Sequence, residues 1–203
     1  MDSLPLPRPF FERPTLQVAR DLLGQRLVRR ETSGKRTSGW ITETEAYIGP
    51  QDLACHARAG RTVRNAAMWG PPGHAYVYFT YGMHWCLNLV TQPDGFPAAV
   101  LVRGLLAAEG KSRMLRRRRM PAESVGLLNG PAKLCQALGI DGTLDGHDLC
   151  RGGARLWVEP WLDLPDSAVT LGPRVGLNKV PEPWRSLPWR FRVSPLLLAN
   201  YAD

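Results

Sequence analysis

The chain has 203 residues, of which 44% are hydrophobic and 22% charged, and it carries a formal net charge of +8. This length suits one domain with a real core, which we expect to span residues 1–203. No apolar run approaches the ~20 residues that a membrane-spanning helix needs, so we expect no membrane partner. The positive charge favours nucleic acid as a partner, because each phosphate that a protein neutralises releases condensed counterions. Colloidal solubility is an alternative explanation of the same charge.

The first quarter of the chain predicts a short helix and two strands. Residues 1–14 contain prolines and acidic residues without a signal-peptide pattern, and we expect them to be loosely ordered. Apolar side chains at roughly helical spacing predict a helix over residues 15–23. A strand starts at residues 27–30, a polar turn covers residues 32–38, and alternating side chains over residues 40–48 predict the return strand.

A hairpin follows a polar loop over residues 49–65. We expect its first strand at residues 75–80 and its second at residues 83–90, with the turn around Tyr81 and Gly82. Glycine suits a turn position with positive φ, which Tyr81 would resist.

The second half of the chain predicts a further strand and two helices. The strand covers residues 98–103, and a helix is expected over residues 106–119. Another helix opens at Asn129-Gly130-Pro131 and closes at Gly139. Strands outnumber helices in a meander-like order, which predicts a single mixed α+β domain around an antiparallel sheet.

The four cysteines are expected to be reduced thiols of a cytoplasmic protein, because they are widely spaced and no secretory signal precedes them. Cys55-His56 together with His84 and Cys86 could supply four zinc ligands. Adjacent residues of an extended segment point to opposite faces, however, and no Cys-x-x-Cys pair is present. We therefore expect no metal and no cofactor.

Glu43, Glu45 and Tyr47 occupy one face of the strand predicted at residues 40–48. The two carboxylates are two residues apart and thus about 7 Å from each other, so one of them could serve as a general base. A solvated strand face explains the same pattern, and the local pattern does not choose between the carboxylates.

The hairpin is unusually aromatic, with Tyr76, Tyr78, Tyr81, His84 and Trp85 within ten residues. Tyr76 and Tyr78 are compatible with simple packing, since core strands are often aromatic. Tyr81 is harder to explain in this way because hairpin tips face water. A bulky ring at a projecting tip suits a wedge that enters a DNA base step and fills the gap left by a displaced base.

Several basic residues are candidates for phosphate contacts. Arg58, Arg61 and Arg64 precede the hairpin, and the backbone amides after Asn129 open a helix. Each is also compatible with ordinary solvated surface. The run Arg116–Arg119 points in all directions from a helix, so we expect a solvated helix end rather than a specific site.

The sequence resembles the alkyladenine (3-methyladenine) DNA glycosylase family from about Leu22 to Val193. Three blocks in the right order carry the resemblance, each of which would be weak alone. The first is Glu43-Thr44-Glu45-Ala46-Tyr47, with Gly49-Pro50, Asp52, His56, Gly60-Arg61-Thr62, Arg64-Asn65 and Met68; the second is Tyr76-Val77-Tyr78, Tyr81-Gly82-Met83-His84 and Cys86-Leu87-Asn88; the third is Gly130 to Ala137, followed by Arg174-Val175-Gly176.

The resemblance implies a role for individual side chains. It implies that Glu45 deprotonates the attacking water and that Arg103 helps to hold this water. The flipped base is expected between Tyr47, His56 and Tyr78, above a pocket floor that contains Asn88.

The resemblance also implies that the protruding hairpin inserts into DNA. Tyr81 is the expected intercalating residue, with Met83 near the same site. Lys133 lies in the third block, and we add it to Arg58, Arg61 and Arg64 as a candidate phosphate contact.

The resemblance implies a monofunctional DNA glycosylase of base excision repair, acting as a monomer on double-stranded DNA that contains damaged purines. It would flip 3-methyladenine, with hypoxanthine and ethenoadenine as further candidates, and hydrolyse the N-glycosidic bond to leave an abasic site. Lyase chemistry needs an amine nucleophile, and nothing pairs Lys133 with a neighbour that would activate it. In a bacterium we expect the protein at the nucleoid.

Two other classes of function remain open from the residues alone. A non-enzymatic protein could use the same arginines and Tyr81 to bend DNA through the minor groove. An RNA-binding or RNA-modifying domain could use the aromatic strands to stack single-stranded bases. Glu43 and Glu45 argue against a purely architectural role, because acids near a phosphate-facing surface weaken binding unless they serve chemistry.

Overall fold

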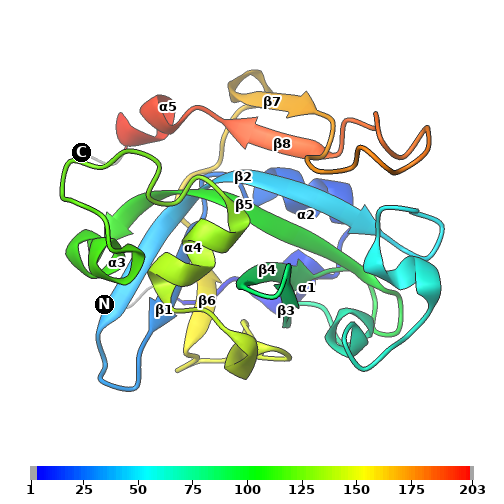
Figure 1. The fold of residues 1–203 in the computed structure, drawn as a ribbon, viewed down its shortest axis with the longest axis horizontal. Helices are drawn as coiled ribbons and strands as arrows, with labels where there is room; N and C mark the ends of the chain where they lie inside the picture. The colour runs from blue at the N-terminus through cyan, green and yellow to red at the C-terminus, as the bar shows by residue number, and fades with distance from the viewer. Residues whose placement is uncertain (1–3, 202–203) are drawn as a thin grey trace.

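The computed structural model describes residues 4–201, which form a curled antiparallel sheet with few helices (Figure 1). This arrangement confirms the predicted α+β domain. The sheet has eight strands, in the order β3-β4-β5-β2-β1-β6, with β8 paired to β2 and β7 paired to β8. Every strand pair is antiparallel.

Residues 4–14 pack against the rest of the protein, so the expectation that they are loosely ordered is wrong. Residues 1–3 of the same expected segment lie outside the described residues. Helix α1 (Arg8–Phe11) buries Phe11 completely, and the Leu6 backbone N–H donates to the Val158 carbonyl at 2.7 Å. Apolar burial of these side chains offsets the entropy lost by ordering the segment. Helix α2 (Thr15–Asp21) follows, within one turn of the predicted boundaries.

Strand β2 (Arg36–Ile48) is the longest and lies at the centre of the sheet. Strand β5 (Ala98–Glu109) runs along one of its edges. Its other edge is shared, because β1 (Arg26–Arg30) covers the first part and β8 (Arg190–Val193) covers residues 43–45. The backbone of β2 is therefore paired on both sides where the candidate carboxylates lie.

The two faces of β2 have different neighbours. The Thr44 hydroxyl donates to the Ala19 carbonyl of α2 at 2.7 Å, so this face packs on α2. Alternation along a strand places Glu43, Glu45 and Tyr47 on the opposite face. The predicted alternation thus separates a packing face from a face that is available for a site.

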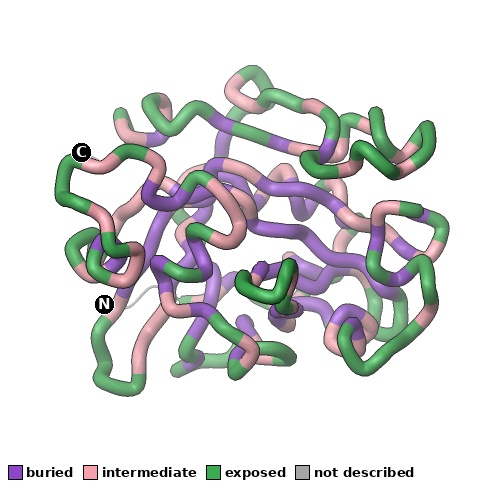
Figure 2. The backbone as a smooth tube through the Cα atoms, viewed as in Figure 1, coloured by how far each residue is buried: buried purple, intermediate pink, exposed green. Residues whose placement is uncertain are grey.

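The hairpin is formed by β3 (Ala75–Thr80) and β4 (His84–Val90), as predicted, and its tip is exposed (Figure 2). Both Tyr81 and Gly82 have positive φ, at 52° and 68°. The sequence assigned positive φ to Gly82, and Tyr81 adopts it as well despite its side chain. A left-handed conformation costs a non-glycine residue about 1–2 kcal/mol, and such strain tends to persist at functional positions.

The helix predicted over residues 106–119 is wrong in its first part. Strand β5 continues to Glu109, because Leu105 and Leu106 stay paired with β2, and this pairing outweighs their helical propensity. Gly110 then turns the chain at φ 77°, where an added Cβ would lie 2.8 Å from the Arg36 carbonyl oxygen, and α3 covers only Lys111–Arg118. Helix α4 (Pro131–Leu138) begins with a proline and ends at Gly139, as predicted.

The remaining elements are short. They are the 3-10 helices η1 (His56–Ala59), η2 (Ala66–Trp69), η3 (Gly142–Leu144) and η4 (Asp166–Ala168), the strands β6 (Leu156–Glu159) and β7 (Val169–Gly172), and α5 (Pro195–Ala199). Among residues 4–201, no helix has the length and apolar character needed to cross a membrane.

The described core has one large apolar cluster and two smaller ones, of which one includes residues of the loop that follows β2. That cluster contains Cys55, Ala57, Met68, Tyr76, Val90 and Ala99, against which Tyr47 and Tyr78 pack. Two of the residues expected in a base pocket are therefore supported from behind by packed side chains, so their rings are held in place.

Candidate active site

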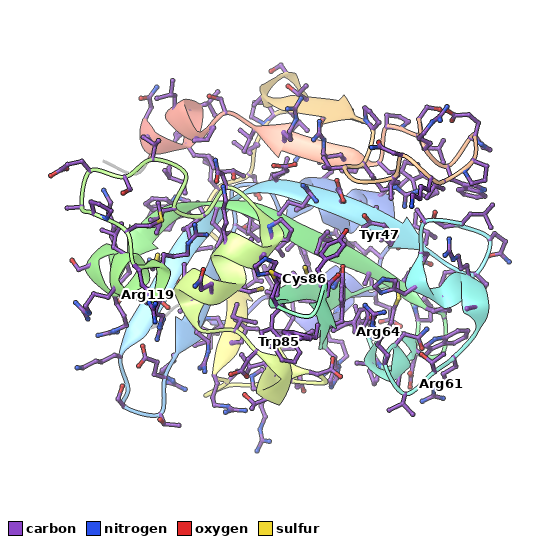
Figure 3. The ribbon with its side chains drawn as sticks, viewed as in Figure 1. Tyr47, Arg61, Arg64, Trp85, Cys86 and Arg119 are labelled. Atoms are coloured by element: carbon purple, nitrogen blue, oxygen red, sulfur yellow. The ribbon has the colours of Figure 1, made fainter. Side chains whose placement is uncertain are left out.

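A cavity of about 340 Å³ opens between the hairpin, the C-terminal part of β2, β5 and the first turn of α4. Tyr47 and Cys86, which line it, lie near the centre of the face shown in Figure 3. The cavity brings together six of the predicted site residues, although they come from segments far apart in the chain. Its lining is Tyr47, Ala54, His56, Tyr78, Thr80, Tyr81, Cys86, Asn88, Leu101, Arg103, Pro131, Val175, Gly176 and Leu177.

Glu45 lies directly behind this lining, with a side chain that is fully buried. Its Oε2 accepts a hydrogen bond from the Tyr47 hydroxyl at 2.8 Å, and its Oε1 accepts one from the Val175 backbone N–H at 2.6 Å. The Arg103 guanidinium lies 3.3 Å from Oε1 and 3.5 Å from Oε2. All three partners line the cavity, so a carboxylate is held immediately next to it.

Burial raises the pKa of Glu45 above its ordinary value, while Arg103, the Val175 N–H and Tyr47 act in the opposite direction. These donors favour the charged form and thus limit the effect of burial. A carboxyl group in such an environment accepts a proton more readily than a solvent-exposed glutamate, as a general base requires.

Glu43 lies on the same strand face but in a different environment. Its side chain is 23% exposed, and Oε1 lies 3.0 Å from Arg103 Nε and 3.6 Å from Arg190 Nη1. It does not line the cavity. The tertiary structure therefore separates the two carboxylates, placing Glu45 behind the cavity wall and Glu43 between Arg103 and Arg190.

His56, Tyr76 and Tyr78 form an aromatic cluster, in which His56 and Tyr78 line the cavity and Tyr76 is buried behind them. The rings of His56 and Tyr78 are 4.6 Å apart and nearly perpendicular, and His56 Nδ1 lies 2.9 Å from the Tyr76 hydroxyl. His56 is exposed as a residue, but the desolvation of its ring, together with the positive charges of Arg64 and Arg58, lowers its pKa to about 4. His56 is therefore neutral at pH 7, and it can stack on a base without adding charge.

Asn88 is buried at the floor of the cavity. It lies opposite Tyr76 across the hairpin, and its Nδ2 donates to the Tyr76 carbonyl at 3.1 Å. This bond fixes the orientation of the amide. Asn88 therefore both hydrogen-bonds the neighbouring strand and lines the cavity.

The hairpin tip projects from the rim of the cavity. Tyr81 is 86% exposed and lines the rim, whereas Met83 is 68% exposed and does not line the cavity. Other large apolar side chains are exposed to a similar degree, so what distinguishes Tyr81 is its place at the rim of the cavity. The insertion of Tyr81 and Met83 into DNA stays a prediction.

The predicted phosphate contacts are all exposed, and none of them lines the cavity. Arg58 donates to the Leu53 carbonyl at 2.7 Å, and Arg64 donates to the Phe79 carbonyl at 3.2 Å, near the tip of the hairpin. Lys133 donates to Asn129 Oδ1 at 2.8 Å. Arg61 and Arg64 lie on the same side of the hairpin in Figure 3, and their contact with phosphates stays a prediction.

The run of arginines at the end of α3 is partly structural. Arg117 contacts Glu31 at 2.6 Å and donates to the Ala137 carbonyl at 3.0 Å, while Arg116 and Arg119 are exposed. In Figure 3 Arg119 lies on the far side of the hairpin from Arg61. Of the four arginines, Arg116 and Arg119 are therefore solvated, as expected for a helix end, whereas Arg117 and Arg118 are partly buried.

The sequence analysis assigned no role to three residues that lie next to the site, Asp52, Arg174 and Val175. Val175 supplies the backbone N–H to Glu45, and Asp52 pairs with Arg174 in the interior. All three belong to the blocks that carry the family resemblance. Nothing in their local sequence indicates that they meet β2, since Val175 and Glu45 are 130 residues apart.

A metal site is not formed by these side chains. Within residues 4–201 no group of three or more His, Cys, Asp and Glu is placed to hold a metal ion. Cys55, Cys86, Cys135 and Cys150 carry free thiols, and burial raises the pKa of Cys150, the most exposed of them, to about 11.

Comparison with known proteins identifies a family and several relatives. The model of the methylpurine-DNA glycosylase family matches residues 9–195. A protein of Methanocella arvoryzae named "Putative 3-methyladenine DNA glycosylase" is 49% identical over 187 residues, which cover 92% of this chain and 90% of the relative. Proteins with the same name from Streptomyces avermitilis and Chlorobaculum parvum are 47% and 45% identical, covering 91% and 89% of this chain and 87% and 83% of the relatives.

Proposed function

Since the chain belongs to the methylpurine-DNA glycosylase family, we propose that it flips a damaged purine from duplex DNA into the cavity and hydrolyses its N-glycosidic bond. The product is an abasic site, and the attacking nucleophile is water. The observation that carries this proposal is Glu45, a buried carboxylate whose three hydrogen-bonding partners all line the cavity.

Glu45 is the proposed general base. The longest of its contacts is that of Arg103 Nη1 at 3.5 Å, and this is the contact that a water molecule could replace. The water would then donate a proton to Glu45 while its oxygen bonds to C1′ of the sugar. The C1′–N bond breaks, and its electron pair leaves with the base. The carboxylate also stabilises the positive charge that develops on the sugar.

Arg103 has a second proposed role, which is to keep Glu45 ionised. Its guanidinium lies within 3.5 Å of both oxygens of Glu45 while it also binds Glu43 at 3.0 Å. Because Glu43 shares this guanidinium, Arg103 keeps a partner when water separates it from Glu45. The pair can therefore open without leaving a buried charge alone.

The proposed base pocket consists of Tyr47, His56, Tyr78 and Asn88. Burial raises the pKa of Tyr76 above its usual range, so its hydroxyl keeps its proton and can donate to His56 Nδ1. The ring proton of His56 is then on Nε2, which leaves an N–H donor for the flipped base. Stacking on an aromatic ring contributes about 1–3 kcal/mol for each base.

Lesion chemistry favours purines whose glycosidic bond is already weak. Purines such as 3-methyladenine carry a positive charge and leave as neutral molecules, so a base and a water suffice. Hypoxanthine and ethenoadenine are neutral and need a hydrogen bond or proton as they depart, for which the Nε2–H of His56 is the proposed donor. We propose all three as substrates.

Tyr81 and Met83 are the proposed DNA-inserting residues, and Arg58, Arg61, Arg64 and Lys133 are the proposed phosphate contacts. A tyrosine held at the rim of the cavity can enter the space that the flipped base vacates. Unstacking a base costs a few kcal/mol, which such a plug partly offsets.

The direct test is a glycosylase assay on two substrates, methylated duplex DNA and a duplex with a single hypoxanthine. We expect release of free base and strand breaks only after alkali treatment. Binding without release would favour the DNA-bending alternative, and activity confined to RNA would favour the RNA alternative.

A further inference from the structure

Asp52 and Arg174 form an ion pair that is sealed inside the protein. Arg174 Nη1 lies 2.5 Å from Asp52 Oδ2, Nη2 donates to Oδ1 at 2.9 Å, and both side chains are fully buried. Neither residue lines the cavity or contacts the proposed path of the base. A buried ion pair recovers little more than its desolvation cost, so stability alone is a weak explanation for it.

Arg174 binds the strand that carries the proposed base. It donates to the carbonyl of Ala46, the residue between Glu45 and Tyr47, at 2.9 Å. Its guanidinium also lies 4.7 Å from the centre of the Tyr47 ring and 4.9 Å from the centre of the Trp189 ring. A planar guanidinium that both donates and stacks fixes the position of the ring.

Asp52 binds the two ends of the turn that follows this strand. Its Oδ2 accepts from the Ile48 N–H at 3.3 Å, and its Oδ1 accepts from the Ala54 N–H at 3.0 Å. Ala54 lines the cavity. The carboxylate therefore joins the end of β2 to the loop that forms one wall of the cavity.

Arg174 is also directly followed by Val175, whose backbone N–H donates to Glu45 at 2.6 Å. The ion pair thus places the segment that supplies this donor against the strand that supplies its acceptor. The other hydrogen bonds of Arg174 go to the Ala46 and Trp184 carbonyls, so among the described residues its bonds to Asp52 are the ones that join this segment to the loop after β2.

We propose that Asp52 and Arg174 act as a positioning pair for hydrolysis, holding the Val175 N–H on Glu45 and the Tyr47 ring against the cavity. This inference rests on the proposed function and deepens it, because it assigns a role to two residues that touch neither the DNA nor the water.

A positioning role predicts that loss of the ion pair changes how the excision rate depends on pH, whereas a merely structural role does not. The charged and titratable groups that face Glu45 are Arg103 on β5, and Glu43 and Tyr47 on β2, with Arg190 of β8 next to Glu43. The Val175 N–H favours the carboxylate form of Glu45. Loss of this bond therefore raises the pKa of Glu45, and the activity that depends on the carboxylate is lost at a higher pH.

The test is Asp52→Asn, measured as single-turnover release of methylated bases from methylated duplex DNA over a series of pH values. The substituted side chain keeps an acceptor for the turn, but its NH₂ group faces the guanidinium of Arg174. The matched control is Glu159→Gln, which neutralises a buried carboxylate that binds Arg26 far from the cavity. Arg174→Lys serves as the second variant if Asp52→Asn does not fold at the assay temperature.

We expect Asp52→Asn to lose about 10- to 100-fold in rate at neutral pH, because small misplacements of reacting groups have effects of this size. In the plot of rate against pH, the fall in rate on the acid side should move to higher pH for Asp52→Asn. For Glu159→Gln it should match the wild type. The proposal is overturned if Asp52→Asn or Arg174→Lys folds and loses activity at the same pH as the wild type. It is also overturned if Glu159→Gln shows an equal shift. A wild-type protein without any excision would instead refute the proposed function.

Discussion

Glu45→Gln is the substitution that separates the proposed chemistry from binding. The fully buried carboxylate accepts from Tyr47, Val175 and Arg103, and an amide of the same shape can replace two of these contacts. It cannot take a proton from water. Loss of a general base typically costs about 10²- to 10⁴-fold in rate, which corresponds to about 3–5 kcal/mol of transition-state stabilisation.

The same substitution should leave the fold nearly intact. Burial already raises the pKa of Glu45, so its environment opposes the charged form more than water does. Arg103 keeps Glu43 as a partner at 3.0 Å and is not left unpaired. We therefore expect a change in the free energy of unfolding of only about 1 kcal/mol, the scale of one hydrogen bond.

The assay is single-turnover excision of hypoxanthine, run beside a binding measurement on the same duplex. Glu43→Gln is the matched control, since Glu43 lies on the same strand face and binds the same arginine. We expect the control to lose less than about tenfold, because it only loosens Arg103. Comparable losses in both variants, or none in either, would show that Glu45 is not the base. Loss of DNA binding in Glu45→Gln would point to a folding defect.

Four further outcomes follow from the same site. Borohydride should trap no covalent adduct with lesion DNA, and an adduct that disappears in Lys133→Ala would establish the amine nucleophile that we exclude. Tyr81→Ala should reduce excision most for well-paired lesions, since mismatched bases cost less to flip, and equal losses in both contexts would contradict the wedge. Asn88→Ser should raise excision of guanine relative to hypoxanthine by removing bulk near the 2-amino group, a difference of roughly 1–3 kcal/mol in discrimination; an unchanged ratio in an active variant would make Asn88 purely structural. A protonated Glu45 cannot act as a base, and burial raises its pKa. As the pH decreases, the excision rate should therefore begin to fall above the ordinary pKa of glutamate. A rate that depends on Glu45 but does not change over this pH range would refute the assignment.

Local patterns in the sequence were sufficient for most of the sheet. Alternation over residues 40–48 and the glycine at the hairpin turn predict β2 and the β3–β4 hairpin, because side-chain period and turn chemistry act over a few residues. The helix predicted from Leu106 failed for the opposite reason. Its first residues are held in β5 by backbone bonds to β2, which belongs to a segment far earlier in the chain.

The positive φ of Tyr81 could not be predicted from the local sequence either. Sequence rules assign positive φ to Gly82, and the structure has it at both residues. The conformation turns an aromatic side chain outward at the tip, where no packing requirement accounts for it. Rules based on average preference miss such a residue because it departs from that preference.

By itself the sequence determined that Glu43, Glu45 and Tyr47 share one strand face, since alternation is a property of the strand alone. It also determined the family, through its three ordered blocks. Only the tertiary structure decided which carboxylate is buried next to a cavity, because that depends on Arg103 and on Val175, which arrives from 130 residues away. Burial and hydrogen bonding are set by segments that meet after folding, and these set the chemistry available to Glu45.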